Sequence, residues 1–246
     1  MVRRLQELDQ AKSDFVSSVS HELRTPLTSI TGYLEMLQDG DAGDLNSEQL
    51  ELLDVVERNS RRLLNLIEDL LTLSRIESGK LRMANEHVDA VDLITDVEKA
   101  VVPLLAARSL DFHTDLAADL GSLAGDRGQL ERVMLNLITN AIKFTPDGGN
   151  VMLTAHRTER ELAIEVADTG IGIPEAEQHR LFTRFFRSST AQQNAIQGTG
   201  LGLAIVKSIV EQHHGSIGLR SAPGVGTTVR VVLPATSEPA ERIGVS

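Results

Sequence analysis

The chain has 246 residues, a formal net charge of −11 and a hydrophobic fraction of 41%. This length and composition indicate one or two globular domains with enough apolar material for a sizeable core. The acidic balance argues against a dedicated nucleic-acid binder, because such proteins usually carry a basic patch. There is no cysteine, which excludes disulfides and thiolate metal sites and fits a reducing compartment.

The sequence shows no sign of a membrane-spanning segment. No apolar run approaches the roughly 18 residues that a transmembrane helix needs, and residues 1–10 lack a signal-peptide pattern. We therefore expect the chain as given to be cytoplasmic.

The first third of the chain predicts two long helices. The first carries an apolar stripe at intervals of three or four residues, formed by Phe15, Val19, Leu23, Leu27, Ile30, Leu34 and Leu37. Residues 39–44 are rich in glycine and aspartate and predict a loop. Asn46, with Gln49 three residues later, predicts a capping box at the start of the second helix. The stripe of that helix comprises Leu53, Val56, Leu63, Ile67 and Leu70, and Ser78-Gly79 predicts its end.

These two helices also predict how the chain assembles. A hairpin of two amphipathic helices has too little core by itself, whereas pairing two hairpins in a four-helix bundle buries both stripes. We therefore expect a homodimer through residues of about 10 to 80.

From about residue 81 the pattern changes to short β-like runs that alternate with helices. Strands are expected at residues 110–116, 151–156, 161–167, 216–220 and 227–233. Helices are expected at residues 91–107, 127–143 and 201–213. The pattern predicts an α+β sandwich with helices on one face of a sheet. Residues 175–200 lack a clear period after Phe186 and predict a functional lid or a disordered segment.

His21 lies on the first predicted helix. It is two residues from both Val19 and Leu23, so at ~100° per residue it falls away from the apolar stripe and is expected to be exposed. An exposed imidazole can act as a nucleophile near neutral pH, and Glu22 can take a proton or hold the ring tautomer. Pro26 removes a backbone donor and predicts a kink. Alone, His21 is as compatible with an ordinary surface histidine, and the second histidine of a zinc-protease motif is missing.

Two motifs in the second part of the chain suit a nucleotide. Asn136, Asn140 and Lys143 share one helix face, where amide oxygens suit Mg²⁺ and an ammonium suits phosphate. The segment Asp168–Pro174 follows a β-like run. Its glycines permit close approach of a ligand, and its carboxylate can accept from an exocyclic amine such as that of adenine. Singly, the first motif is also typical of a polar helix face and the second of a tight turn.

A glycine-rich motif, Gly198–Leu203, opens the last predicted helix and presents backbone N–H groups that suit phosphate. Its spacing is neither that of a Rossmann fingerprint nor that of a P-loop. Between the two glycine motifs, residues 182–187 carry aromatic side chains that can anchor a lid and arginines that can reach a γ-phosphate. The order of all these motifs within one chain is a stronger signal than any one of them.

In this combination the chain resembles the bacterial two-component sensor histidine kinases over roughly residues 13 to 234. His21–Leu27 looks like the H box of that family, Asn136–Phe144 like the N box and Asp168–Pro174 like the first G box. Residues 182–187 look like the F box and residues 198–203 like the second G box.

The resemblance implies a division of the chain into four parts. Residues 1–12 would be a helical linker from a missing sensor region, and residues 13–80 a dimerisation and histidine phosphotransfer domain. Residues 81–236 would be a catalytic domain with the Bergerat-type ATP-binding fold, and residues 237–246 a flexible tail. The implied fold class is a helical hairpin that forms a dimeric four-helix bundle, followed by an α/β sandwich.

The resemblance also implies a reaction, with ATP and Mg²⁺ as cofactors. His21 would be phosphorylated from ATP with Glu22 as general base, and the phosphoryl group would pass to an aspartate of a response regulator. Thr25 would position a water for dephosphorylating that regulator, and Asn140 would bind Mg²⁺. The residues implied to contact the nucleotide are Asn136, Asn140, Lys143, Phe144, Asp168, Gly170, Gly172, Arg187, Gly198, Thr199, Gly200, Leu201, Gly202, Leu203 and Thr227.

The expected partners are a second copy of the chain and the receiver domain of a cognate response regulator, without nucleic acid. A membrane contact is expected only through the missing N-terminal part, which would anchor the full-length protein in the cell membrane. Three alternatives remain: an ATPase of the gyrase, MutL and chaperone class, a scaffold with a degenerate ATP site, and a protein in which regulator phosphatase activity dominates. The remaining histidines are expected to be ordinary surface or helix-end residues: His87, His113, His156, His179, His213 and His214.

Overall fold

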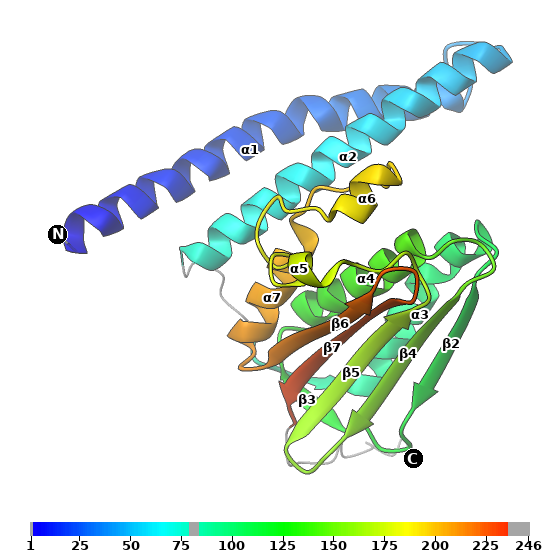
Figure 1. The fold of residues 1–246 in the computed structure, drawn as a ribbon. Helices are drawn as coiled ribbons and strands as arrows, with labels where there is room; N and C mark the ends of the chain where they lie inside the picture. The colour runs from blue at the N-terminus through cyan, green and yellow to red at the C-terminus, as the bar shows by residue number, and fades with distance from the viewer. Residues whose placement is uncertain (1, 79–83, 236–246) are drawn as a thin grey trace, which may run out of the picture. The chain divides into compact units, whose positions relative to one another are not determined.

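The computed structural model describes residues 2–78 and 84–235 (Figure 1). The chain divides into two compact units, residues 1–82 and residues 83–246. The expected domain boundary at residues 80 and 81 and the expected tail at residues 237–246 lie outside the described residues. Within the described ranges, no helix is long and apolar enough to cross a membrane.

The first unit is a hairpin of α1 (Val2–Gln38) and α2 (Ser47–Glu77). The start of α2 confirms the predicted capping box. The Asn46 side chain accepts a hydrogen bond from Gln49 N, and the Gln49 side chain accepts one from Asn46 N, both at 2.9 Å. The C-cap of the helix is Ser78, whose backbone N–H donates to Ser74 O at 3.1 Å. Gly79, predicted as part of this end, lies outside the described residues.

The core of the hairpin uses only part of each apolar stripe. Leu27 of α1 lies in one cluster with Ile67 and Leu71 of α2, and Leu64 packs against them. Other apolar residues of the stripes are exposed: Leu23, Ile30, Val56, Leu63 and Leu70. At ~100° per residue, the three exposed residues of α2 lie along one flank of the apolar stripe whose other flank is buried. Each helix therefore presents apolar residues of its stripe that the hairpin leaves uncovered.

The second unit is built on a sheet of five strands in the order β2-β4-β5-β7-β6. The strands are β2 (Asp111–Leu116), β4 (Asn150–Arg157), β5 (Glu161–Asp168), β6 (Ser216–Ala222) and β7 (Gly226–Pro234). β2 pairs with β4 in parallel, and all other neighbours are antiparallel. All five strands agree with the sequence prediction to within two residues at each end.

Three helices cover one face of this sheet, as Figure 1 shows: α3 (Ala90–Ala106), α4 (Arg127–Phe144) and α7 (Gly202–Gln212). Alternate residues of β5 face these helices and are buried, namely Leu162, Ile164 and Val166. The predicted α+β sandwich with helices on one face is therefore confirmed. The alternation continues to the end of β5 and places Asp168 on the helix-covered face.

Four short elements complete the unit and were absent from the sequence prediction. β1 (Glu86–Asp89) and β3 (Ser122–Gly125) form a separate antiparallel pair. α5 (Glu175–Gln178) and α6 (Ser189–Gln193) lie within the predicted lid segment. Four or five residues are too few to show a period of 2.0 or 3.6.

Candidate functional site: a nucleotide site and an exposed histidine

The first part of the site is a row of three polar residues across the sheet. Asp168 of β5 stands opposite Thr227 of β7, which stands opposite Ser221 of β6. Asp168 Oδ1 accepts hydrogen bonds from Gly170 N at 2.8 Å and from Thr227 N at 3.2 Å. Burial raises the pKa of the Asp168 carboxyl, and these two N–H donors oppose that rise. The carboxylate is thus held in place by one oxygen, and the other remains available to a ligand.

The loop after β5 packs directly against the end of α4. A Cβ atom on Gly170 would lie 2.5 Å from Phe144 O, so only glycine allows this close approach. The backbone N–H of Ile171 donates to the same carbonyl at 3.2 Å. Gly172 has a φ of +66°, and a Cβ atom there would lie 1.9 Å from Ala222 O. These contacts bring the predicted first G box to the end of the predicted N box.

The second part of the site is the polar face of α4. Asn140 Nδ2 donates to Asn136 Oδ1 at 3.0 Å. A Cβ atom on Gly202 would lie 2.4 Å from Asn136 Nδ2, and one on Gly198 would lie 3.0 Å from Lys143 Nζ. The glycine-rich loop therefore runs along the face that carries the two amides and the ammonium. Lys143 Nζ also lies 5.0 Å from the centroid of the Phe144 ring.

The remaining residues of the glycine-rich motif shape the loop itself. Thr199 Oγ1 accepts a hydrogen bond from Leu201 N at 3.1 Å. Leu201 is buried, and Leu203 is half-buried on the first turn of α7. A nucleotide contact by Leu201 is thus limited to its backbone. Gly200 has a φ of +73° and its carbonyl accepts from Phe185 N at 2.9 Å, which ties the loop to the predicted F box.

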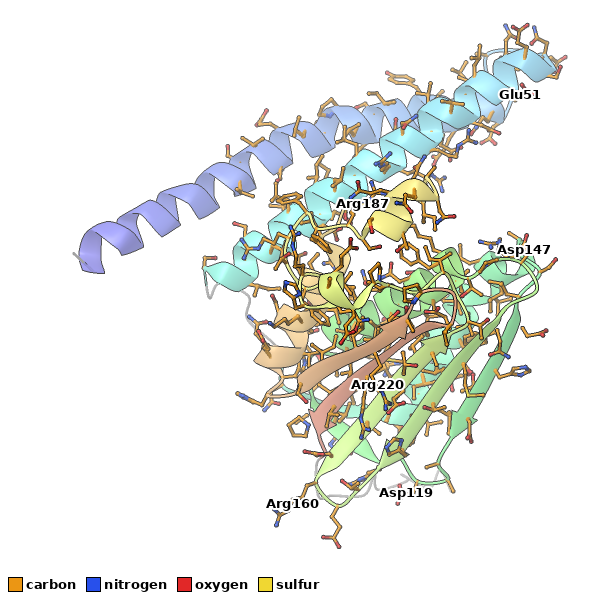
Figure 2. All side chains as sticks on the ribbon, viewed as in Figure 1. Glu51, Asp119, Asp147, Arg160, Arg187 and Arg220 are labelled. Atoms are coloured by element: carbon orange, nitrogen blue, oxygen red, sulfur yellow. The ribbon has the colours of Figure 1, made fainter. Side chains whose placement is uncertain are left out.

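The predicted lid is held by its own hydrogen bonds. Glu177 Oε2 accepts from Ser189 N at 2.9 Å. Arg187, which Figure 2 shows beside α6, donates from Nη2 to Ile196 O at 2.5 Å. Phe185 is 64% exposed and has a φ of 59°, an uncommon conformation for a bulky residue. A guanidinium has five N–H donors, two of them on Nη2, so this bond leaves Arg187 further donors for a phosphate.

The predicted phosphoacceptor lies in the other unit, on α1. His21 is exposed, as the sequence predicted, and Glu22 is exposed as well. Thr25 Oγ1 donates to His21 O at 3.3 Å, one turn further along the helix. Pro26 lies inside α1 and provides no N–H for the carbonyl of Glu22. His21 is therefore a solvent-facing imidazole next to a carboxylate.

His213 is a helix-end residue, as the sequence predicted, because it is the C-cap of α7, but it is buried and only 6% exposed. Its Nδ1 lies 2.8 Å from Ile209 O, and its Nε2 accepts from Asp126 N at 3.1 Å. A carbonyl can only accept, so the ring carries its proton on Nδ1. His213 thus joins the end of α7 to the N-cap residue of α4. The other histidines are exposed, as predicted: His87, His113, His156, His179 and His214.

Sequence reasoning also missed Ser221 and Gln178, which surround the row of polar residues. Ser221 Oγ lies 2.8 Å from Thr227 Oγ1, and Gln178 Nε2 donates to Ser221 O at 2.7 Å. The available signal was the turn Gly224–Gly226, because a hairpin closed there places residue 221 opposite residue 227.

Two family models match the chain. The model described as "His Kinase A (phospho-acceptor) domain" matches residues 11–79. The model described as "Histidine kinase-, DNA gyrase B-, and HSP90-like ATPase" matches residues 125–237. The first therefore contains His21, and the second contains the whole polar row and the glycine-rich loop.

Known proteins show the same combination. Sensor histidine kinase TmoS of Ectopseudomonas mendocina is 38% identical over 237 residues, which are 95% of this chain and 24% of TmoS. The crystal structure of full-length ShkA in complex with AMPPNP has a TM-score of 0.76 at 27% identity, over 92% of this chain and 47% of that one. The mycobacterial sensor histidine kinase MprB is 33% identical with a TM-score of 0.55, over 61% of this chain and 97% of that one. The chain spans about a quarter to a half of the length of the curated relatives that it matches.

A phosphoacceptor hairpin followed by a nucleotide-binding sandwich defines the catalytic core of a protein-histidine kinase. The chain belongs to the sensor histidine kinase family.

Proposed function

We propose that this chain phosphorylates His21 with ATP and passes the phosphoryl group to an aspartate of a response regulator. The observation that carries the proposal is an exposed imidazole beside Glu22, in a chain that also holds the nucleotide residues on one sandwich. A ring nitrogen of His21 attacks the γ-phosphorus, the bond from that phosphorus to the β,γ-bridging oxygen breaks, and ADP leaves. Glu22 takes the proton that the attacking imidazole loses.

In this proposal the sandwich positions the nucleotide and neutralises its charge. The free oxygen of Asp168 accepts from the adenine amine, and the N–H groups of the glycine-rich loop face the phosphates. Lys143 and Arg187 contribute positive charge, Arg187 after the lid rearranges. Asn136 holds the amide of Asn140 through their 3.0 Å hydrogen bond.

The residues present also fit the Mg²⁺ that the proposal requires. Asn140 uses its Nδ2 on Asn136, and its Oδ1 accepts no hydrogen bond from the described residues. A neutral amide oxygen is a suitable hard ligand, and Mg²⁺ usually binds through few protein groups together with substrate phosphates. We infer that Asn140 Oδ1 is the protein ligand. When bound, Mg²⁺ stabilises the charge that develops on the phosphate oxygens.

The exposed apolar faces of the hairpin support a homodimer. Leu23 and Ile30 of α1 are 44% and 42% exposed, and Val56 and Leu63 of α2 are 45% and 43% exposed. Each pair is seven residues apart, the spacing of a bundle seam. We propose that a second hairpin covers these faces in a four-helix bundle.

The other predicted features follow from the same proposal. A receiver domain would dock on the bundle near His21, and Thr25 would orient a water that removes phosphate from the regulator. The linker role of residues 1–12, the missing sensor region and its membrane anchor stay predictions.

The test is incubation of the protein with γ-labelled ATP and Mg²⁺. We expect label that is stable in base and labile in acid, the behaviour of a phosphoimidazole. His21→Gln should abolish the label and leave ATP binding unchanged, whereas His113→Gln, a matched change of another exposed histidine, should change neither. Asn140→Asp should reduce the label at least tenfold and weaken Mg-ATP binding in calorimetry. Label retained in His21→Gln would refute the assignment of the phosphoacceptor.

A further inference from the structure

Groups within the protein take up the full hydrogen-bonding capacity of the Ser221 hydroxyl. Ser221 Oγ lies 2.8 Å from Gly226 O, 2.8 Å from Thr227 Oγ1 and 2.9 Å from Ile173 N. The first partner is a carbonyl, which can only accept, and the last is an N–H, which can only donate. A hydroxyl has one proton and two lone pairs. The Ser221 hydroxyl must therefore donate its one hydrogen bond to Gly226 O.

This proton count fixes the hydroxyl of Thr227. Ser221 has no second proton, so the 2.8 Å contact between the two hydroxyls is a hydrogen bond only if Thr227 donates. Thr227 Oγ1 then presents only lone pairs to any further partner. Its cross-strand neighbour Asp168 also presents lone pairs. Oδ1 accepts from two N–H donors, and Oδ2 accepts no hydrogen bond from the described residues.

The surroundings hold Ser221 in this role. Gln178 Nε2 donates to Ser221 O at 2.7 Å and to Ile173 O at 3.0 Å. Gln178 therefore ties the loop that carries Ile173 to β6. The N–H of Ile173 donates to Ser221 Oγ from this loop. Ser221 and Thr227 also stand opposite each other in the β6–β7 pairing, so their hydroxyls meet at a set register.

We propose that Ser221 determines base specificity by keeping Thr227 Oγ1 an acceptor, so that this end of the sheet presents two acceptors side by side. A carboxylate alone does not select adenine, because guanine also offers N–H donors. Two neighbouring acceptors favour a base edge with an exocyclic amine, as in adenine, and disfavour one with a carbonyl at the same position, as in hypoxanthine. The proposal rests on the nucleotide site described above, and Ser221 acts through Thr227 as a positioning residue.

The experiment compares the Kd of ADP and of inosine diphosphate (IDP) by calorimetry on the full chain. The two ligands differ in that IDP has a carbonyl in place of the amine. In Ser221→Ala, the Thr227 hydroxyl is free to donate to that carbonyl, so the ratio of Kd for IDP to Kd for ADP should fall about three- to tenfold from its wild-type value. Ser221→Thr keeps the hydroxyl and should keep the wild-type ratio within twofold.

A double-mutant cycle separates this role from a general structural one. In a Thr227→Val background there is no hydroxyl for Ser221 to hold, so Ser221→Ala should then change the ratio less than twofold. Ser221→Cys, a weaker hydrogen-bonding group, serves in place of Ser221→Ala if thermal unfolding shows that the alanine variant is not folded. A ratio that Ser221→Ala leaves unchanged, or changes equally in the Thr227→Val background, overturns this inference alone. A wild-type protein that binds neither nucleotide overturns the proposed nucleotide site as well.

Discussion

At the scale of single residues, the ligand binding proposed for Asp168 opposes its effect on stability. Burial raises the pKa of its carboxyl, so the folded chain holds that proton more tightly than the unfolded chain. The contribution of Asp168 to stability is therefore fully present below its unfolded pKa, about 3.9, and is lost as pH rises through the folded pKa. Above the folded pKa the ionised carboxylate weakens the fold, although it is the form proposed to bind the ligand.

Asp168→Asn should separate these two effects. Asparagine keeps an oxygen for Gly170 N and Thr227 N but carries no charge, so the melting temperature at pH 7 should not fall. ATP should bind at least tenfold more weakly, because a charge-assisted acceptor is lost. Thermal unfolding from pH 4 to 8, with calorimetry at pH 7, measures both. Any stability gain over wild type should shrink as pH falls toward 4.

The matched control is Asp147→Asn, at the exposed loop that Figure 2 labels between α4 and β4. The pKa of Asp147 is lowered by its hydrogen bond from Arg108, 2.7 Å from Nε to Oδ1. Its stabilising effect is present above the unfolded pKa and is lost as pH falls, the reverse of Asp168. Asp147→Asn should thus lower the melting temperature slightly at pH 7 and leave ATP binding unchanged. A larger loss of stability in Asp168→Asn than in Asp147→Asn would contradict our account of Asp168.

At the scale of elements, the two helices that carry the proposed phosphate-binding groups are joined at their far ends by His213. Its Nε2 accepts from Asp126 N at the start of α4, and its Nδ1 donates to Ile209 O near the end of α7. A Cβ atom on Gly125 would lie 2.5 Å from this ring, so the packing there leaves no spare room. The buried imidazole therefore fixes the position of α7 relative to α4.

His213→Ala should lower the free energy of unfolding by about 2–3 kcal/mol, because it leaves the N–H of Asp126 without its partner and opens a cavity, whereas Ile209 O keeps the backbone N–H of residue 213. Urea unfolding measures this. The control is the neighbouring exposed His214, which has a φ of 59°. His214→Asn should stay within about 0.5 kcal/mol of wild type, because asparagine tolerates that conformation. Equal losses in the two variants would mean that the Asp126–His213–Ile209 connection contributes nothing specific.

The helices and strands differ in how far the sequence could predict them. The long helices and the five main strands follow from local periodicity, and the capping box at Asn46 is a local signal confirmed by geometry. β1 and β3 are too short for any period to show. The inward-facing Leu64 and Leu71 of α2 were missed, because Leu63 and Leu64 both follow helical spacing and only the contact with α1 decides which of them faces inward.

At the scale of the whole molecule, the predicted site residues form two groups. Local helix spacing brings some of them together, and pairing between distant segments brings the others together. Asn136, Asn140 and Lys143 share a face because one helix carries them, which the spacing alone predicts. The meeting of Asp168 with Thr227 depends on strands paired across 59 residues, and the burial of His213 on a contact across 87 residues. No local pattern encodes such registers. The exposure of His21 was predictable because the apolar stripe of α1 excludes it.

The central claim is that the γ-phosphoryl group of ATP ends on this chain and not in water. Simultaneous quantification of ADP, free phosphate and protein-bound phosphate, in one time course with purified wild-type protein and Mg-ATP, tests it most directly. We predict that ADP and base-stable protein-bound phosphate rise together, one for one, until His21 is occupied, and that free phosphate lags behind. ADP matched from the first time point by free phosphate, without protein-bound phosphate, would instead identify an ATPase of the gyrase and chaperone type and contradict the account.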